Sequence, residues 1–208
     1  MSAQDLASLD PVEAACALLG AVVRVGEVAI RLTEVEAYGG PEDGPWPDPS
    51  AHSYRGPNAR NAVMFGPAGH LYVYRSYGLH LCANISVGPD GVAAAVLLRG
   101  GEVVEGEECA RQRRTPGMPA DKLARGPGNL AAALGLDISD NGLDMFSEQS
   151  RVRLELPEQR PEVAVASGPR VGISVAADRP WRRWIPGSPG VSAYRRSPRA
   201  PALRARMG

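Results

Sequence analysis

The amino-acid sequence predicts a single mixed α/β domain of the α+β class, in which helices flank a curved, mainly antiparallel β-sheet with a protruding β-hairpin. Three observations support this fold. Short segments with strand patterning are separated by tight, glycine-containing turns, as in antiparallel sheets. Helical patterning is confined to a few short segments. The 208 residues contain neither an internal repeat nor an interdomain linker, so one core accounts for the length.

The N-terminal elements are predicted from their caps and turns. Asp10 and Pro11 are typical of an N-cap and a first helical position, and Gly20 is typical of a helix end. The dipeptide Gly26-Glu27 forms a tight turn between two strand-like segments. In chain order we expect a helix over residues 11–20, strands over 21–25 and 28–37, and a Gly/Pro-rich loop over 39–50.

The later elements follow the same logic. Tyr77 and Gly78 connect two strand-like segments as a hairpin. The nearly continuous apolar run 92–99 is typical of a central strand that is buried on both faces. In chain order we expect strands over 69–76, 79–87 and 92–99, helices over 102–114 and 130–134, and strands over 151–156 and 170–176.

The charges are unevenly distributed although the formal net charge is zero. Residues 1–50 carry a net charge of −7, residues 51–150 of −1 and residues 151–208 of +8. A basic C-terminal third can supply contacts to phosphate groups, but a solvated tail explains the charges of residues 195–208 equally well. We expect one domain over residues 1–190 and a basic, flexible tail over residues 191–208.

Nothing in the sequence indicates a membrane protein or a zinc protein. There is no apolar run of about 18 residues, and the first ten residues lack the features of a signal peptide, so we expect a cytoplasmic protein. The three cysteines, Cys16, Cys82 and Cys109, lie far apart and lack the spacing of a zinc site. We expect reduced thiols and no metal, and no two histidines are spaced as metal ligands either.

The most suggestive pattern is the alternation in residues 32–38, which places Glu34, Glu36 and Tyr38 on one face of a strand. Two carboxylates next to a long loop are suited to acid–base chemistry. A half-exposed strand with a solvated acidic face explains the pattern as well. On spacing alone, Glu34 and Glu36 are equal candidates.

Tyrosines also cluster, since Tyr72, Tyr74 and Tyr77 occur within six residues beside Arg75. A bulky aromatic residue at an exposed hairpin tip, as expected for Tyr77, is costly unless it inserts into a partner. Such a wedge can fill the gap left by an extruded base, and neighbouring aromatic rings can stack on bases. Tyr72 is equally explained by packing on the core.

Arg99 ends the apolar run of its strand, where a lone charge usually marks a carboxylate partner or the edge of a cleft. A pair between Glu36 and Arg99 would favour the ionised form of Glu36, as a general base requires. Asn84 lies on the preceding strand and also needs a partner if buried.

Ordered blocks of sequence resemble the alkyladenine DNA glycosylases, which are also called 3-methyladenine or methylpurine DNA glycosylases. The blocks span roughly residues 11–190 and are Glu34-Val35-Glu36-Ala37-Tyr38 with Gly40-Pro41-Glu42-Asp43, Ala51-His52-Ser53, Arg60-Asn61 with Met64-Phe65, Gly69-His70-Leu71-Tyr72-Val73-Tyr74 with Tyr77-Gly78, Cys82-Ala83-Asn84-Ile85-Ser86, Val96-Leu97-Leu98-Arg99 with Glu105-Gly106, Gly126-Pro127-Gly128-Asn129-Leu130, Arg170-Val171-Gly172-Ile173, and Trp181-Arg182. Any one block is a weak signal, whereas the ordered set is specific.

The resemblance implies a role for each matching residue. Glu36 corresponds to the general base that deprotonates a water molecule, and Arg99 to the arginine that helps to hold that water. The flipped base would stack between Tyr38 on one side and His52 and Tyr74 on the other. Tyr77 resembles the residue that intercalates into the duplex, and Asn84 the asparagine that disfavours normal guanine. Arg75 and Arg182 are expected to contact the DNA backbone.

The activity implied by the resemblance is base-excision repair of double-stranded DNA by a monomer that becomes nucleoid-associated when bound. A damaged purine, alkylated or deaminated, would be flipped out and its N-glycosidic bond hydrolysed to leave an abasic site. Hydrolysis by water fits a chain with a single lysine, Lys122, so we expect no lyase activity and no cofactor. The sequence does not rank 3-methyladenine, 7-methylguanine, hypoxanthine and etheno-adenine as substrates.

The chain departs from the family pattern in the segment Gly44-Pro45-Trp46-Pro47-Asp48-Pro49, which lengthens the connection between Tyr38 and His52. Arg75 and Ser76 also replace apolar residues before Tyr77. Two other functions stay open from the sequence. One is a non-catalytic binder of damaged DNA on the same fold, and the other is a small-molecule hydrolase or transferase that uses Glu36 and Arg99.

Overall fold

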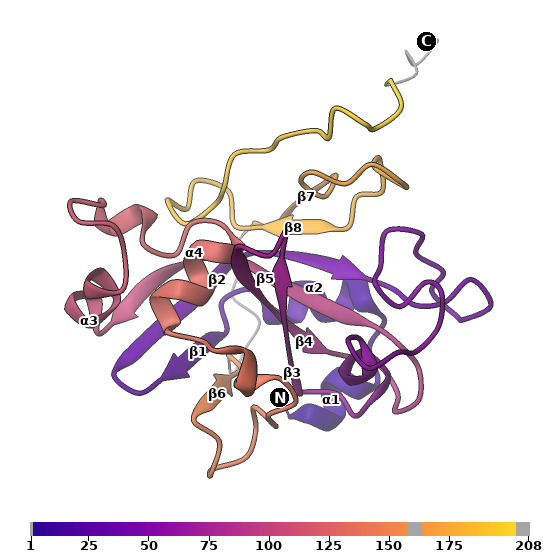
Figure 1. Ribbon diagram of the computed structural model, residues 1–208, viewed down its shortest axis with the longest axis horizontal. Coiled ribbons are helices and arrows are strands. Elements are labelled where there is room, and N and C mark those ends of the chain that lie inside the picture. Colours follow the sequence, from indigo (N-terminus) through magenta and orange to yellow (C-terminus); the bar gives the residue numbers. More distant parts are fainter. Residues whose placement is uncertain (1, 158–163, 203–208) are drawn as a thin grey trace.

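An eight-stranded antiparallel sheet forms the frame of the protein, for which a computed structural model describes residues 2–157 and 164–202 (Figure 1). The main strand order is β3-β4-β5-β2-β1-β6, and β8 pairs with both β2 and β7. The strands are β1 (Val22–Val25), β2 (Val28–Tyr38), β3 (Leu71–Ser76), β4 (His80–Ser86), β5 (Ala95–Glu105), β6 (Val152–Glu155), β7 (Ala166–Gly168) and β8 (Arg182–Trp184).

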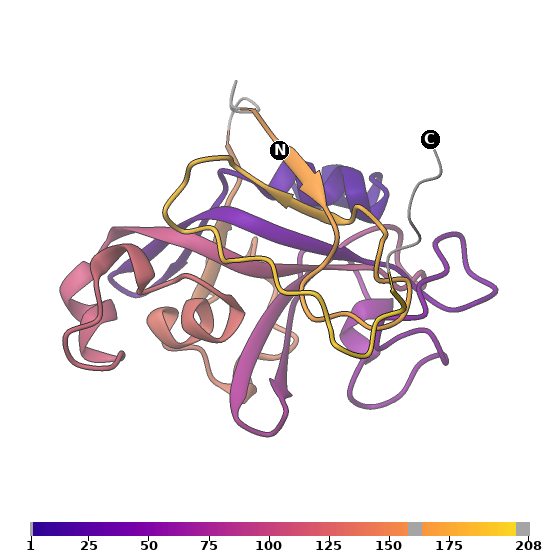
Figure 2. The same ribbon diagram turned by 90° about the horizontal axis from the view of Figure 1, so that it is seen from above.

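Short helices cover this sheet. Figure 2 shows the N-terminal helices and the pair α3 and α4 on opposite sides of it. The helices are α1 (Ala3–Ala7), α2 (Pro11–Leu18), α3 (Glu107–Gln112) and α4 (Pro127–Leu134), and the 3-10 turns are η1 (Ala62–Phe65), η2 (Ala120–Lys122) and η3 (Ile138–Asp140). The predicted single α+β domain with a curved antiparallel sheet is therefore confirmed.

The longest strands, β2 and β5, lie side by side at the centre of the sheet. The strand expected over 92–99 begins only at Ala95 and continues to Glu105, and its residues 95–99 are buried, as predicted. Helix α2 begins as expected, because the Asp10 carboxylate accepts hydrogen bonds from the backbone amides of Val12 (2.7 Å) and Glu13 (2.8 Å). Helices thus cover both faces of the central strands, which makes them a rigid support for side chains.

The hairpin of β3 and β4 projects from the body of the molecule, as expected (Figure 2). Its turn spans Tyr77 (φ +50°), Gly78 (φ +72°) and Leu79 between the paired Ser76 and His80, and the Leu79 amide donates to the Ser76 carbonyl (3.0 Å). The side chains of Tyr77 and Leu79 are 96% and 76% exposed. The hairpin therefore presents two apolar side chains to solvent at its tip.

Two predicted elements need correction. The helix expected over residues 102–114 is replaced by α3 alone, because Glu102 and Glu105 continue β5 and pair with β2 before Gly106 (φ +68°) ends the strand. No strand forms over 170–176. That segment turns at Gly172 (φ +73°). In this part of the chain, the strands that join the sheet are β8, which pairs with β2, and β7, which pairs with β8.

Contacts of the C-terminal segment continue beyond residue 190. Ser192 hydrogen-bonds to the buried Glu34 through its amide (2.7 Å) and its hydroxyl (3.0 Å), and the Arg195 carbonyl accepts from the amide of Gly172 (2.9 Å). The last six residues of the expected tail, 203–208, lie outside the described residues. Across the described ranges, no helix has the length and apolar character needed to cross a bilayer.

Candidate active site

A cavity of about 480 Å³ lies beside the hairpin, a size typical of small-ligand sites. Side chains from separate parts of the chain line it. They come from β2, the loop after it, η1, both strands of the hairpin, β5, the start of α4 and the segment 171–173. Among them are seven predicted site residues: Glu36, Tyr38, His52, Tyr74, Tyr77, Asn84 and Arg99. The fold therefore brings the candidate catalytic, stacking and intercalating residues to one place.

Glu36 lines the cavity, and its side chain is fully buried from bulk solvent. Its Oε1 accepts a hydrogen bond from the Val171 amide (2.7 Å), and its Oε2 accepts one from the Tyr38 hydroxyl (3.0 Å). The predicted partner Arg99 has its Nε 3.5 Å from Oε1. A carboxylate held in this way has a fixed orientation and faces a largely apolar pocket, as a general base requires.

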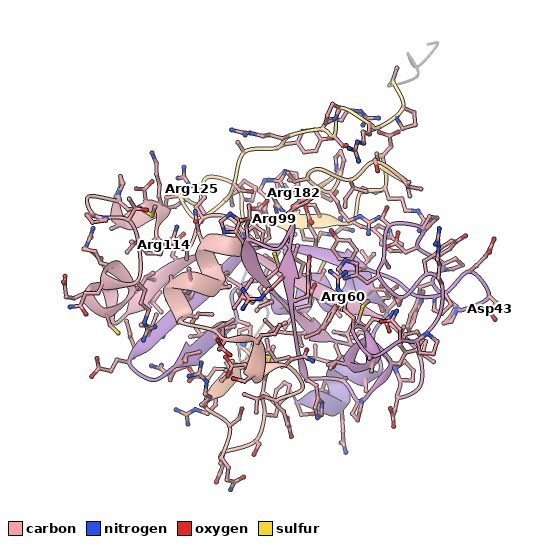
Figure 3. The ribbon with its side chains drawn as sticks, viewed as in Figure 1. Asp43, Arg60, Arg99, Arg114, Arg125 and Arg182 are labelled. Carbon is pink, nitrogen blue, oxygen red and sulfur yellow. The ribbon has the colours of Figure 1, made fainter. Side chains whose placement is uncertain are left out.

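Glu34 occupies the same strand face but has different surroundings. It is fully buried and is absent from the cavity lining. Its Oε1 accepts from Arg99 Nε (3.0 Å) and from Arg182 Nε (2.6 Å), and both oxygens accept from Ser192. Figure 3 shows Arg99 and Arg182 close to one another. Glu34 is therefore saturated with partners and holds the arginines, which leaves Glu36 as the carboxylate that faces the cavity.

Aromatic rings form the walls of the cavity. His52 stands edge-on to Tyr74, with ring centroids 4.6 Å apart and planes at 87°. The His52 Nδ1 lies 3.0 Å from the Tyr72 hydroxyl, and the His52 carbonyl accepts from the Asn61 side chain (2.9 Å). The loop over residues 44–49 thus leaves His52 in the cavity lining. Tyr38 comes from β2 and adds a further aromatic ring to the cavity lining.

Burial favours the neutral forms of the tyrosines, the histidine and the cysteine that line the cavity. Burial raises the pKa of Tyr74 above its ordinary value, and burial together with the Glu36 charge raises the pKa of Tyr38. Burial also raises the pKa of the Cys82 thiol. Desolvation by the cavity walls, followed by the positive charge of Arg60, lowers the pKa of His52. Neutral rings can stack on a charged ligand without electrostatic repulsion.

Replacing Arg60 with glutamine is expected to raise the pKa of His52, because a nearby cation disfavours the protonated imidazole. An NMR titration of the His52 ring protons measures this shift. Arg55→Gln serves as the matched control, since Arg55 is also exposed but lies outside the cavity. Identical titration curves for both variants would show that Arg60 does not act on His52.

Asn84 and Tyr77 complete the set of predicted residues that line the cavity. Asn84 is buried on β4, and its side-chain amide donates to the Tyr72 carbonyl (3.1 Å), which fixes it against the wall. Tyr77 stands at the mouth and is almost fully exposed. The cavity thus has a polar amide inside it and an exposed aromatic ring at its entrance.

The two arginines expected at a DNA backbone differ in their positions. Arg75 is exposed on β3 beside the hairpin tip. Arg182 requires a correction, because it is only 4% exposed and donates to Glu34 and to the Ser192 carbonyl (2.8 Å). An arginine buried against a carboxylate is not available to bind a phosphate, so Arg182 supports the site from within.

Sequence reasoning assigned no role to Val171, Arg170, Asp48 or Ser192, which the fold brings beside the predicted residues. Arg170 and Val171 belong to a block that matched the family, so that match was the available signal for them. Within the described ranges, no three His, Cys, Asp or Glu side chains are grouped as ligands for a metal ion. Apart from His52, the charged residue types that line the cavity are Glu36, Arg60 and Arg99.

Comparison with known proteins places these residues in context. The family model for methylpurine-DNA glycosylase (MPG) matches residues 5–189, which include the whole cavity lining. The chain is 60% identical over 193 residues to a protein of Nocardia farcinica, covering 93% of this chain and 91% of the relative. It is 57% identical over 202 residues to one of Mycobacterium sp. strain KMS (97% and 98% covered) and 59% identical over 199 residues to one of Rhodococcus jostii (96% and 88% covered). All three relatives bear the name "Putative 3-methyladenine DNA glycosylase".

Proposed function

Since the chain belongs to the methylpurine-DNA glycosylase family and is a DNA glycosylase, we propose that it flips damaged purines out of duplex DNA and hydrolyses their N-glycosidic bonds with Glu36 as the general base. One observation carries this proposal. The buried carboxylate of Glu36 faces a cavity walled by aromatic rings, and the exposed Tyr77 ring stands at the cavity mouth.

Extrusion of the base is assigned to the hairpin. Removing a base from the stack costs a few kcal/mol and leaves a gap in the duplex. The exposed Tyr77 ring is large and apolar enough to fill that gap while the extruded nucleotide enters the cavity beside it. Arg75 lies one residue pair from the tip and can contact a phosphate there.

Recognition of the base is assigned to the aromatic walls. A purine that enters the cavity would stack between Tyr38 on one side and His52 and Tyr74 on the other. Stacking of this kind is worth about 1–3 kcal/mol per base. A cationic alkylated purine also gains from the faces of the aromatic rings. Asn84, held against the wall by Tyr72, would crowd the exocyclic amine of an undamaged guanine.

Hydrolysis is assigned to Glu36 and a water molecule. Glu36 takes a proton from the water while the water oxygen bonds to C1′ of the sugar. The C1′–N bond breaks, and its electron pair leaves with the purine. A cationic alkylated base becomes neutral in this step, whereas a neutral base leaves as an anion and takes up a proton from solvent. Arg99 lies 3.5 Å from Glu36 and balances its charge before the proton moves. The products are the free base and an abasic site.

A lyase step is not part of this proposal. Such a step needs an amine nucleophile that forms a Schiff base with the sugar. Lys122, the single lysine, lies in η2 and does not line the cavity. We therefore infer a monofunctional enzyme that acts on double-stranded DNA.

Base release from synthetic duplexes tests the function. Separate duplexes carry one 3-methyladenine, 7-methylguanine, hypoxanthine or etheno-adenine, and both the free base and strand breakage are measured. We expect free base from at least the alkylated purines, with strands that break only after alkali treatment. Duplexes from which no lesion is released, or strands that break without alkali, would contradict the proposal.

Replacing Tyr77 with serine is expected to slow base release by about 10- to 100-fold, because the duplex then re-forms its stack without a wedge. Single-turnover rates on one lesion-containing duplex measure the effect. Tyr77→Phe should retain most of the rate, since the ring fills the gap and the hydroxyl does not. Tyr194→Ser is the matched control, because Tyr194 is an exposed tyrosine away from the cavity. Equal rates for Tyr77→Ser and the control would show that Tyr77 does not act as the intercalating wedge.

A further inference from the structure

Arg170 and Asp48 form a buried ion pair directly behind the cavity wall. Both side chains are inaccessible to solvent. Arg170 donates from Nη1 to Asp48 Oδ2 (2.6 Å) and from Nη2 to Asp48 Oδ1 (2.9 Å), so the two groups make a two-bond fork. Burial alone would raise the pKa of Asp48, but the hydrogen bonds and charge of Arg170 outweigh it and hold the pKa below its ordinary value.

The pair touches the catalytic strand at two points. Arg170 Nη1 also donates to the carbonyl of Ala37 (3.0 Å), the residue between Glu36 and Tyr38. The guanidinium carbon of Arg170 lies 4.6 Å from the centre of the Tyr38 ring, which is a stacking distance. Arg170 therefore packs over the Tyr38 ring without itself lining the cavity, whereas Tyr38 does line it.

The next residue in the chain reaches the catalytic carboxylate. The Val171 amide donates to Glu36 Oε1 (2.7 Å), so any movement of Arg170 also moves this hydrogen bond. Asp48 is tied to β2 as well, because its carboxylate accepts from the amide of Gly39 (3.2 Å). The inserted loop that contains Asp48 thus fastens the segment at 170–171 against the part of β2 that carries Glu36 and Tyr38.

We propose that Arg170, held by Asp48 from the inserted loop, is a positioning residue that sets Tyr38 against the extruded base and the Val171 amide against Glu36. This inference rests on the proposed function. A buried ion pair is by itself weak evidence for a contribution to stability, since an apolar pair of similar volume often serves the fold equally well. Such an apolar pair would lose the stacking of the Arg170 guanidinium on Tyr38 and would no longer position the Val171 amide against Glu36.

The double variant Asp48→Leu/Arg170→Met tests the proposal because it removes both charges together and leaves no unpaired ion. We expect it to fold, as judged by circular dichroism and thermal melting. Its single-turnover rate of 7-methylguanine release at saturating enzyme should fall by about 10- to 100-fold, since small displacements of reacting groups have effects of this size. Its affinity for a duplex with a tetrahydrofuran abasic analogue, which offers no base to stack, should match that of the unaltered protein.

Arg170→Lys is the second variant and keeps the test decisive if the double variant does not fold. Lysine retains the charge that Asp48 needs but cannot lie flat on a ring while donating a fork. As for the double variant, we expect slower release of 7-methylguanine and unaltered affinity for the abasic duplex. Arg151→Lys is the control, because Arg151 also makes a two-bond fork, through Nε and Nη2 to Asp140 (2.6 and 2.9 Å), at a more exposed position away from the cavity lining, and it should keep the full rate.

Two results would overturn the proposal. One is an unaltered rate of base release in a folded Arg170 variant, which would mean that the ion pair only holds the loop in place. The other is a parallel fall of rate and abasic-duplex affinity, which would mean that the variant disturbs DNA binding in general. Failure of the proposed function itself looks different, because the unaltered protein would then release no base.

Discussion

Glu36→Gln is expected to slow single-turnover base release by about 10²- to 10⁴-fold, the usual contribution of a general base. Glutamine has nearly the same shape as glutamate and can keep the hydrogen bond from the Val171 amide. It cannot accept a proton from water at neutral pH. The measurement is the release of free base from a duplex with a single damaged purine, at enzyme concentrations that saturate the duplex.

A slower release by Glu36→Gln identifies Glu36 as the base only if this variant still binds the duplex. Affinity for the same duplex, measured by fluorescence anisotropy, should be at least that of the unaltered protein, because the stacking walls and Tyr77 are untouched. Glu102→Gln is a matched control, since Glu102 is a carboxylate on β5 that does not line the cavity. Base release by Glu36→Gln at the rate of this control would exclude Glu36 as the base and favour a different source of the nucleophile.

Glu34→Ala is expected to lower the free energy of unfolding by about 3–5 kcal/mol, the usual cost of removing one partner of a buried ion pair. The change would leave Arg99 and Arg182, which are both buried, without the carboxylate that accepts from each of them. It would also remove the acceptor of the two Ser192 hydrogen bonds. Urea denaturation followed by circular dichroism measures the loss.

Glu105→Gln provides the comparison for this stability effect. Glu105 pairs with Arg24 at the surface, where water screens the charges, so the free energy of unfolding should hardly change. If Glu34→Ala unfolds at the same urea concentration as Glu105→Gln, the network around Glu34 does not hold the C-terminal segment onto the sheet. The different roles of Glu34 and Glu36 would then need another explanation.

The central part of this fold could be predicted from local sequence signals. Strand alternation placed Glu34, Glu36 and Tyr38 on one face, and the turn at Tyr77-Gly78 gave the hairpin with its exposed tip. The expected pair of Glu36 and Arg99 also forms, although Arg99 lies closer to Glu34. These features succeed because they depend on residues that are near in sequence or on adjacent antiparallel strands.

What the sequence did not reveal depends on contacts between distant segments. Spacing could not separate Glu34 from Glu36, because the difference comes from Arg182 and Ser192, about 150 residues further along the chain. The same contacts bury Arg182, which sequence reasoning had placed at the DNA. Residues 170–176 have strand-like composition, yet the ion pair of Arg170 with Asp48 and the turn at Gly172 hold them as an irregular segment.

We expect the cavity beside Glu36 to receive a purine extruded from duplex DNA. The decisive measurement is a crystal structure of the Glu36→Gln protein with a duplex that contains one damaged purine. We expect the purine ring between Tyr38 and His52, its C1′ facing residue 36, and the Tyr77 ring in the gap of the duplex. A purine that remains stacked in the duplex, with the cavity empty and Tyr77 outside the helix, would contradict it.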